Sequence, residues 1–191
     1  MIHNVAADAP GLSSNAFLVP GERTVLVDAG ANYDAPAAVG ERADDLDAVV
    51  LTHTHPDHVG TVADLRAAFD VETWGYDTDD EAVDREIADG DRVWMGDHEY
   101  EALYTPGHAL DHLCLYAPES RVLFAGDLVF QDGSFGRTDL PGADRATLVE
   151  SIDRLLNRID EDLAAMHAGH GPSVTTDPYD HVKLAAELAR R

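Results

Sequence analysis

The sequence predicts an α/β protein with two mixed β-sheets whose outer faces are covered by helices. Short apolar stretches typical of strands alternate with amphipathic stretches typical of helices, and several neighbouring strands are separated only by a turn. This order favours an αββα layering, in which the sheets pack against each other. The chain has 191 residues, 45% of them hydrophobic, so we expect a single domain over residues 1–191 with a packed core.

The expected elements follow from hydrophobic periodicity and from the residues at their ends. Strands are expected at residues 14–20, 24–28, 47–51, 71–74, 92–95, 100–104, 112–116, 121–125 and 163–166. Helices are expected at residues 35–42, 59–69, 77–88, 144–158 and 178–190. The helix at 77–88 rests on Asp77 or Thr78 as a cap, whereas the helix at 144–158 rests on apolar residues at helical spacing.

The composition is strongly acidic. Asp and Glu number 37 against 13 Lys and Arg, which gives a formal net charge of −24, and the acids are spread along the chain. Such self-repulsion destabilises a compact chain in dilute buffer, but at ~1 M salt the Debye length of about 3 Å removes most of it. We therefore expect a protein of a halophilic, salt-accumulating organism. The charge also disfavours a nucleic-acid partner, because phosphate-binding surfaces are basic.

Neither a membrane nor an export signal is indicated by the sequence. No apolar run approaches the ~20 residues that a membrane span needs. The first residues, Met1-Ile2-His3-Asn4, lack the basic and apolar regions of a signal peptide. We therefore expect a cytoplasmic protein with no membrane partner, and the sequence leaves its oligomeric state open.

The run Thr-His-Thr-His-Pro-Asp-His at residues 52–58 follows an apolar strand and contains four side chains that can bind metals. In an extended segment, residues two apart point the same way, so His53 and His55 can address one ion together. Asp57 and His58 lie at a helix start and can point at a second ion. Imidazole and carboxylate groups are ligands of zinc and its neighbours, so this run predicts a metal site.

Three further candidate ligands lie in loops that follow apolar stretches. His108 ends Thr-Pro-Gly-His, Asp127 ends Leu-Phe-Ala-Gly-Asp, and His170 lies in Ala-Gly-His-Gly-Pro. Glycine in each loop allows the backbone to approach an ion closely. These positions indicate that the site is completed from distant parts of the chain.

With these motifs the sequence resembles the metallo-β-lactamase-fold hydrolases, and within them the glyoxalase II-like branch. The motifs at residues 53–58, 105–108, 126–127 and 169–171 carry the resemblance, which extends from Asn15 to about Pro172. It implies an αββα sandwich with two divalent ions, zinc or alternatively iron, at the edge of the sheets. The implied ligands are His53, His55 and His108 for one ion, Asp57, His58 and His170 for the other, and Asp127 as a bridge.

Other residues are interpreted beside this family pattern. Asp28 matches a strand-end Asp and is expected to orient the ligand loop. His112 either orients a ligand or is a strand histidine without a role. Arg137, in a Phe-Gly-Arg-Thr-Asp stretch shared with short glyoxalase II-like and persulfide dioxygenase-like members, is favoured as a salt-bridge donor over a substrate clamp. No chemistry is assigned to the remaining histidines, which are His3, His98, His167 and His181.

The expected activity is hydrolysis of a small acyl thioester or ester. Two ions that share a water supply a hydroxide nucleophile at neutral pH and stabilise the oxyanion, with Asp57 and Asp127 as the catalytic carboxylates. No dedicated general acid stands out, which favours a thiolate leaving group. Only Lys183, Arg190 and Arg191 are basic at the C-terminus, so the glutathione grip of full-length glyoxalase II-like members is not evident.

Other functions remain open on the same scaffold. A persulfide dioxygenase-like oxidoreductase would use one iron at His53, His108 and Asp127. An RNase Z-like nuclease shares the motif at residues 53–58 but adds a gripping insertion and a basic surface, and neither is evident here. A non-catalytic binding module is disfavoured by the complete ligand set, and nothing points to β-lactam hydrolysis.

Overall fold

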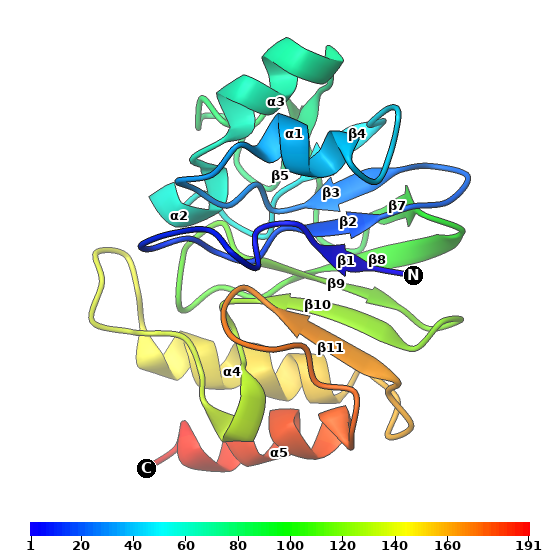
Figure 1. Ribbon diagram of the computed structural model, residues 1–191. Helices are drawn as coiled ribbons and strands as arrows, with labels where there is room; N and C mark the ends of the chain where they lie inside the picture. Colours follow the sequence, from blue (N-terminus) through cyan, green and yellow to red (C-terminus); the bar gives the residue numbers. More distant parts are fainter.

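The structure, a computed structural model that describes residues 1–191, consists of two β-sheets packed face to face with helices on the outside (Figure 1). The N-terminal half of the chain forms one sheet and its helices, and the C-terminal half forms the other. This arrangement confirms the predicted α/β class and the αββα layering.

The first sheet has the strand order β1-β2-β3-β4-β5-β6 and is mixed. Antiparallel pairing joins β1, β2 and β3, whereas β3 to β6 are parallel. The strands are β1 (His3–Asn4), β2 (Phe17–Val19), β3 (Val25–Val27), β4 (Ala48–Val50), β5 (Thr73–Gly75) and β6 (Arg85–Glu86). The helices of this half are α1 (Ala35–Gly40), α2 (Pro56–Val59) and α3 (Val62–Phe69).

The second sheet has the order β11-β10-β9-β8-β7 and is antiparallel except for the parallel pair β10 and β11. Its strands are β7 (Arg92–Met95), β8 (His98–Tyr104), β9 (Leu113–Ala117), β10 (Val122–Gly126) and β11 (Ala165–Ala168). A 3-10 turn, η1 (Gln131–Gly133), follows β10, and the helices α4 (Arg145–Leu156) and α5 (Pro178–Leu188) cover the outer face.

Three apolar clusters fill the three spaces between these four layers. Alternate residues of a strand point to opposite faces, so Leu18 and Leu26 face α1 and α3 while Phe17 and Val27 face the second sheet. Phe124 completes this central cluster from the second sheet. The third cluster joins the outer face of the second sheet to α4 and α5. Burial of both faces of each sheet thus explains the apolar strands read from the sequence.

The helix expected at residues 77–88 is wrong. The carboxylates of Asp77 and Asp80 accept hydrogen bonds from backbone amides two residues later, which stabilises turns in place of a helix. The carboxylate of Asp84 then accepts from the amide of Thr73 at 2.9 Å, and the chain enters the short strand β6 beside β5. Local side-chain bonds and strand pairing therefore override the helical pattern.

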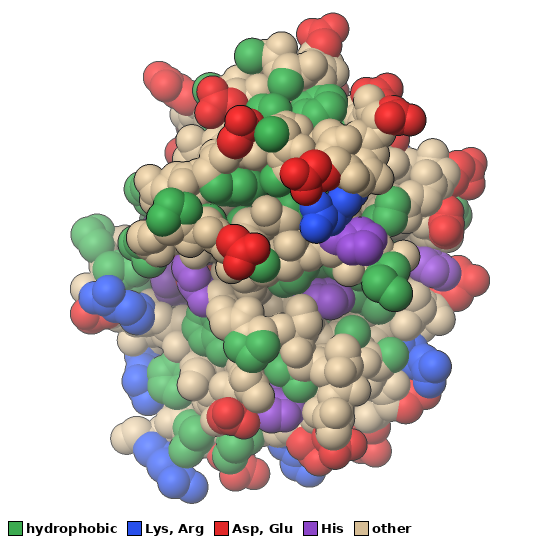
Figure 2. All heavy atoms as spheres, in the orientation of Figure 1, with side chains coloured by type: hydrophobic (Ala, Val, Ile, Leu, Met, Phe, Trp, Pro, Cys, Tyr) green, Lys and Arg blue, Asp and Glu red, His purple; other side chains and the backbone are tan.

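The predicted ligands lie in loops at one edge of the sandwich. His53 and His55 follow β4, His108 lies between β8 and β9, Asp127 follows β10, and His170 follows β11. This edge is at the left of Figure 1, and Figure 2 shows histidine side chains reaching the surface there. None of the helices is long and apolar enough to cross a membrane.

Ion pairs neutralise only a small part of the acidic surface. Eight arginines form ion pairs with carboxylates, and they are Arg42, Arg66, Arg92, Arg121, Arg137, Arg154, Arg158 and Arg190. The chain carries 37 acidic residues, so most of them have no arginine partner. On the face drawn in Figure 2, acidic side chains are scattered and do not form one patch.

The thermal midpoint of unfolding should therefore rise between dilute buffer and molar potassium chloride, because salt screens the repulsion between unpaired carboxylates. For a chain of this length, a rise of about 10 °C corresponds to roughly 3–5 kcal/mol. Calorimetry at a series of salt concentrations measures it, with equal osmolality of sucrose as the control for solute exclusion. A midpoint that does not change with salt would contradict the proposed salt adaptation.

Candidate metal centre

The first group of ligand atoms consists of three imidazole nitrogens. Nδ1 of His55 lies 3.0 Å from Nε2 of His53 and 2.9 Å from Nε2 of His108. Nδ1 of His108 donates a hydrogen bond to the carbonyl of Arg137. Nε2 of His108 is therefore free to present a lone pair to a metal. Three nitrogens that converge in this way form a ligand set for one ion.

The second group combines carboxylate and imidazole atoms. Oδ2 of Asp57 lies 3.1 Å from Nε2 of His170, and Oδ1 of Asp127 lies 3.4 Å from Nε2 of His58. Oδ2 of Asp127 lies 3.5 Å from Nε2 of both His108 and His170. Asp127 thus faces ligands of both groups, as expected for a carboxylate shared by two ions.

The geometry and chemistry of these groups fit divalent metal ions. Nε2 of His58 and Oδ1 of Asp127 are buried and have no hydrogen-bond partner, which is costly for a polar atom unless a ligand satisfies it. Ligands held at about 2.0–2.1 Å in a tetrahedral shell lie about 3.3 Å apart, close to the separations found here. Imidazole and carboxylate donors suit zinc and iron alike.

The pKa shifts of the buried groups run in opposite directions within the centre. Burial alone would lower the pKa of His58, but the adjacent Asp28 and Asp127 carboxylates raise it to about 10. Burial would raise the pKa of Asp127, yet the adjacent His58 and the surrounding imidazoles lower it to about 2. Burial and neighbouring imidazoles hold the pKa of His53 well below its usual value. The carboxylates thus favour positive charge at His58, whereas the His53 ring stays neutral and able to bind a metal.

The carboxylate of Asp28 connects to ligands of both groups. It accepts hydrogen bonds from Nδ1 of His58 at 2.9 Å, and from the amide and hydroxyl of Thr52. Because the Thr52 hydroxyl donates its proton to Asp28, it can only accept from Nδ1 of His53, at 3.1 Å. Asp28 therefore leaves Nε2 of both histidines free for a metal, as the orienting role expected for it requires.

His112 contacts the backbone that carries Asp127. Its Nε2 accepts from the Asp127 amide at 2.9 Å, so its Nδ1 carries the proton and donates to the Thr105 hydroxyl. Burial lowers the pKa of His112 to about 3, which keeps the ring neutral and able to accept. Of the two alternatives open from the sequence, this geometry favours the orienting role.

Asn15 and two glycines are contributors that the sequence analysis did not identify. Nδ2 of Asn15 donates to the carbonyls of Ala168 and Gly171, and thereby fixes the loop that carries His170. A Cβ at Gly169 would lie 2.1 Å from Oδ1 of Asp127, and one at Gly136 would lie 2.1 Å from the Asp127 carbonyl. The Gly-His-Gly and Phe-Gly-Arg-Thr-Asp motifs contain these two glycines without revealing their approach to Asp127, and no motif marks Asn15.

Arg137 and the unassigned histidines take structural positions. Two hydrogen bonds of 2.9 Å join the exposed guanidinium of Arg137 to Asp139, which is the salt bridge favoured from the sequence. His167 packs against Phe17 and Phe124 between the sheets, where burial lowers its pKa to about 4. His3, His98 and His181 also lie outside the ligand groups.

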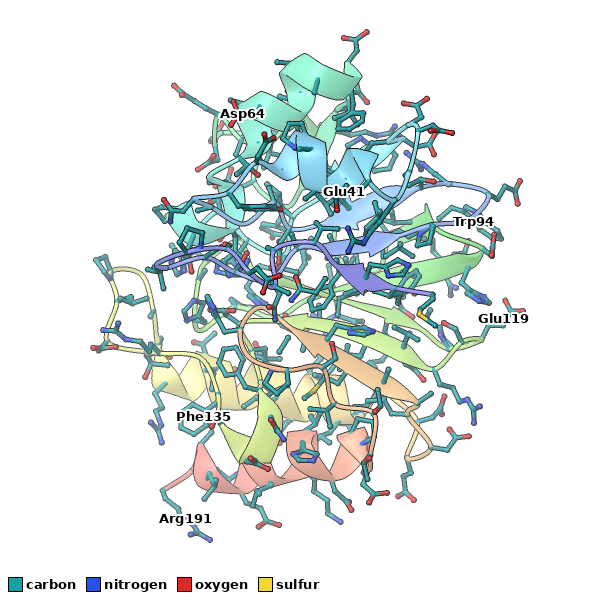
Figure 3. All side chains as sticks on the ribbon, in the orientation of Figure 1. Glu41, Asp64, Trp94, Glu119, Phe135 and Arg191 are labelled. Atoms are coloured by element: carbon teal, nitrogen blue, oxygen red, sulfur yellow. The ribbon has the colours of Figure 1, made fainter.

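A cavity of about 580 Å³ opens in front of the ligand groups. Its volume is within the range of small-molecule sites. The cavity is lined by Leu12, His55, Pro56, Asp57, His108, Asp127, Phe130, Phe135, Arg137, Leu140, Pro141 and His170. Figure 3 labels Phe135, which lies on the segment between β10 and α4. A substrate in this cavity would contact both ligand groups.

Comparison with known proteins identifies the family. The model of the metallo-beta-lactamase superfamily matches residues 9–170, which include the whole ligand set. The chain belongs to this superfamily. Membership agrees with the fold and with histidine and aspartate side chains positioned for binding divalent metals.

Several relatives in this superfamily are similar in sequence. The chain is 35% identical to an uncharacterized protein of Aquifex aeolicus, over 93% of this chain and 90% of that one. It is 32% identical to the hydroxyacylglutathione hydrolase GloC of Haemophilus influenzae, over 71% and 75% of the two chains. The match to a hydroxyacylglutathione hydrolase of Klebsiella pneumoniae, 36% identical over 65% of this chain, spans only 51% of that enzyme.

Solved structures reproduce the fold over nearly the whole chain. BLEG-1, a B3 metallo-beta-lactamase, has a TM-score of 0.80 at 25% identity, and the match covers 98% of this chain and 96% of that one. TTHA1623, solved in a di-iron-bound form, has a TM-score of 0.75 at 34% identity over 93% of each chain. The structure of TTHA1623 thus shows this fold with two iron ions bound.

Alanine substitutions of Asp127 and His112 should reduce metal binding to different extents. Asp127 faces both ligand groups, so Asp127→Ala should lower the content from about two ions per chain to one or none. His112 acts through a backbone hydrogen bond, so His112→Ala should weaken affinity only ~10–100-fold. Elemental analysis and competition with a chelator measure both effects.

His98→Ala provides the control for these substitutions, because His98 lies outside the ligand groups and should leave the metal content unchanged. Equal losses from Asp127→Ala and His112→Ala would contradict the roles assigned to them. One iron per chain in unsupplemented protein would contradict the binuclear arrangement itself.

Proposed function

We propose that this protein is a binuclear metal-dependent hydrolase of small acyl thioesters or related esters. The observation that carries the proposal is the position of Asp127 between two complete ligand groups, which suits a pair of ions sharing one carboxylate. The similarity to curated hydroxyacylglutathione hydrolases supports a thioester as the substrate class.

The proposed ligands of one ion are His53, His55 and His108, those of the other are Asp57, His58 and His170, and Asp127 contacts both. Two bound divalent ions lower the pKa of a shared water towards neutrality and stabilise negative charge on a carbonyl oxygen. We favour zinc from this donor set, and the di-iron form of a similar structure keeps iron as the alternative.

Asp57 is the side chain proposed to orient the attacking water. A hydrogen bond from His170 lowers the pKa of its carboxyl, so Asp57 stays ionised at neutral pH. It lines the cavity beside His170 and Asp127. An ionised carboxylate in this position can accept a hydrogen bond from water and align its lone pair with a carbonyl carbon.

The lining of the cavity favours a leaving group that departs as an anion. Apart from the proposed metal ligands, the lining side chains are apolar except for Arg137. An arginine does not release its proton in proteins, so it cannot act as a general acid. A thiol has a pKa near 8.5 and leaves without protonation far more readily than an amine. Thioesters therefore fit this cavity better than amides.

The alternative functions find less support in the site. A single iron on His53, His108 and Asp127 would leave Asp57 and His170 without a purpose, although both converge on the same centre. A nuclease needs basic groups for phosphate, yet the one arginine that lines the cavity is paired with Asp139. A binding module without activity does not account for a water-accessible centre of this composition.

Metal-dependent thioester hydrolysis should be measurable in molar salt. The assay compares a small acyl thioester, a persulfide and single-stranded RNA in parallel. A chelator should abolish thioester turnover and zinc should restore it, because the ligand groups supply the reactive centre. Asp57→Ala should strongly reduce kcat, whereas His98→Ala should not.

The same parallel assay distinguishes the alternatives. RNA cleavage that depends on metal, without thioesterase activity, would move the protein to the nucleases. Oxygen consumption with the persulfide, together with one iron per chain, would identify a dioxygenase.

A further inference from the structure

The outer wall of the cavity is apolar and is built from two distant parts of the chain. Leu12 comes from the loop before β2, whereas Phe130, Phe135, Leu140 and Pro141 come from the segment between β10 and α4. Figure 1 shows these two loops projecting on the same side of the molecule, at the left. The ligand groups lie at the inner end of this cavity, so a group attached to the reacting carbonyl would extend along the wall.

The wall is fixed in position by contacts on both sides. Nδ2 of the Asn32 side chain donates to the backbone carbonyl of Leu12 at 2.8 Å and so anchors the backbone there. The Leu12 side chain itself is 71% exposed. On the opposite loop, His181 of α5 accepts from the Asp132 amide at 2.8 Å, and Gly133 packs against Leu184. An exposed leucine on an anchored backbone is available to a ligand at little cost in conformational entropy.

The charges around the cavity disfavour an anionic substrate tail. Arg137 is the one basic residue other than histidine among the lining residues, and Asp139 accepts both of its outward hydrogen bonds. The net charge of −24 adds long-range repulsion of anions at moderate salt. A carboxylate-bearing carrier would therefore find no unpaired basic side chain along this wall.

We infer that this wall binds a neutral, apolar acyl chain, and that Leu12 and Leu140 select for it. The inference deepens the hydrolase proposal above and rests on it for the position of the reacting carbonyl. It specifies medium-chain acyl groups on a neutral thiol in place of a polyanionic carrier. Asp139 contributes to this selectivity because it forms an ion pair with Arg137, whose guanidinium would otherwise attract anionic acyl groups.

The kinetic test uses acetyl to octanoyl thioesters of N-acetylcysteamine, a neutral thiol, with the zinc-loaded protein. Each added methylene should raise kcat/KM about two- to fourfold until the wall is covered. Leu12→Ser should flatten this dependence. Trp94→Ser is the control, because Trp94 is an exposed apolar side chain on β7 that does not line the cavity. Rates that do not depend on chain length in the native protein would overturn the inference.

A binding test separates this inference from the hydrolase proposal. S-octyl and S-ethyl thioethers of N-acetylcysteamine cannot be hydrolysed, and calorimetry gives their Kd with the metal-loaded protein. The octyl compound should bind more tightly than the ethyl compound. If Leu12→Ser removes this difference and Trp94→Ser keeps it, the wall is supported even if no thioester is turned over. Equal Kd values for the two thioethers would overturn the inference, whatever the activity.

The charge selectivity is tested with succinyl and butyryl thioesters at the lowest salt at which the protein stays folded. Asp139→Asn frees Arg137 and should raise kcat/KM for the succinyl compound several-fold relative to the butyryl compound. Asp162→Asn is the control, because Asp162 pairs with Arg121 away from the cavity. An unchanged ratio in Asp139→Asn would overturn the role assigned to Asp139.

Discussion

The buried carboxylate of Asp28 is the group on which the metal centre depends. It accepts from His58 directly and acts on His53 through the hydroxyl of Thr52, so one side chain sets the protonation of a ligand in each group. Asp28 directly follows β3 and has a φ of 59°, a left-handed conformation that Asp adopts more readily than most residues. The strand end, the turn and the protonation of both histidines are therefore determined at one position.

Close backbone packing supplies the second constraint. Gly136 and Gly169 let two loops approach Asp127 more closely than any side chain would allow, and His112 holds the Asp127 amide from the opposite side. Asp127 is consequently enclosed by parts of the chain that are far apart in the sequence. This enclosure explains how a carboxylate can keep one oxygen buried without a protein partner, ready for a metal.

Sequence alone predicted the layers, and it named the candidate ligands whose side chains lie together in the structure. The apolar strand segments and the spacing of the residues from His53 to His58 can be read from the sequence without knowing the tertiary contacts. The segment at 77–88 was mispredicted because side-chain bonds to its own backbone and pairing with β5 outweighed helical propensity. The roles of Asn15 and Gly136 could not be predicted. Asn15 acts on a loop more than a hundred residues away, and the role of Gly136 depends on its close approach to Asp127.

Each ligand group combines side chains from both halves of the chain. His53 and His55 are completed by His108, and Asp57 and His58 by His170, across the joint between the two sheets. A bound ion would thus link the two halves of the chain. The affinity of the site for the ion would depend on how closely the two sheets pack against each other. Substitutions in the central apolar layer, far from any ligand, would then weaken metal binding before they unfold the protein.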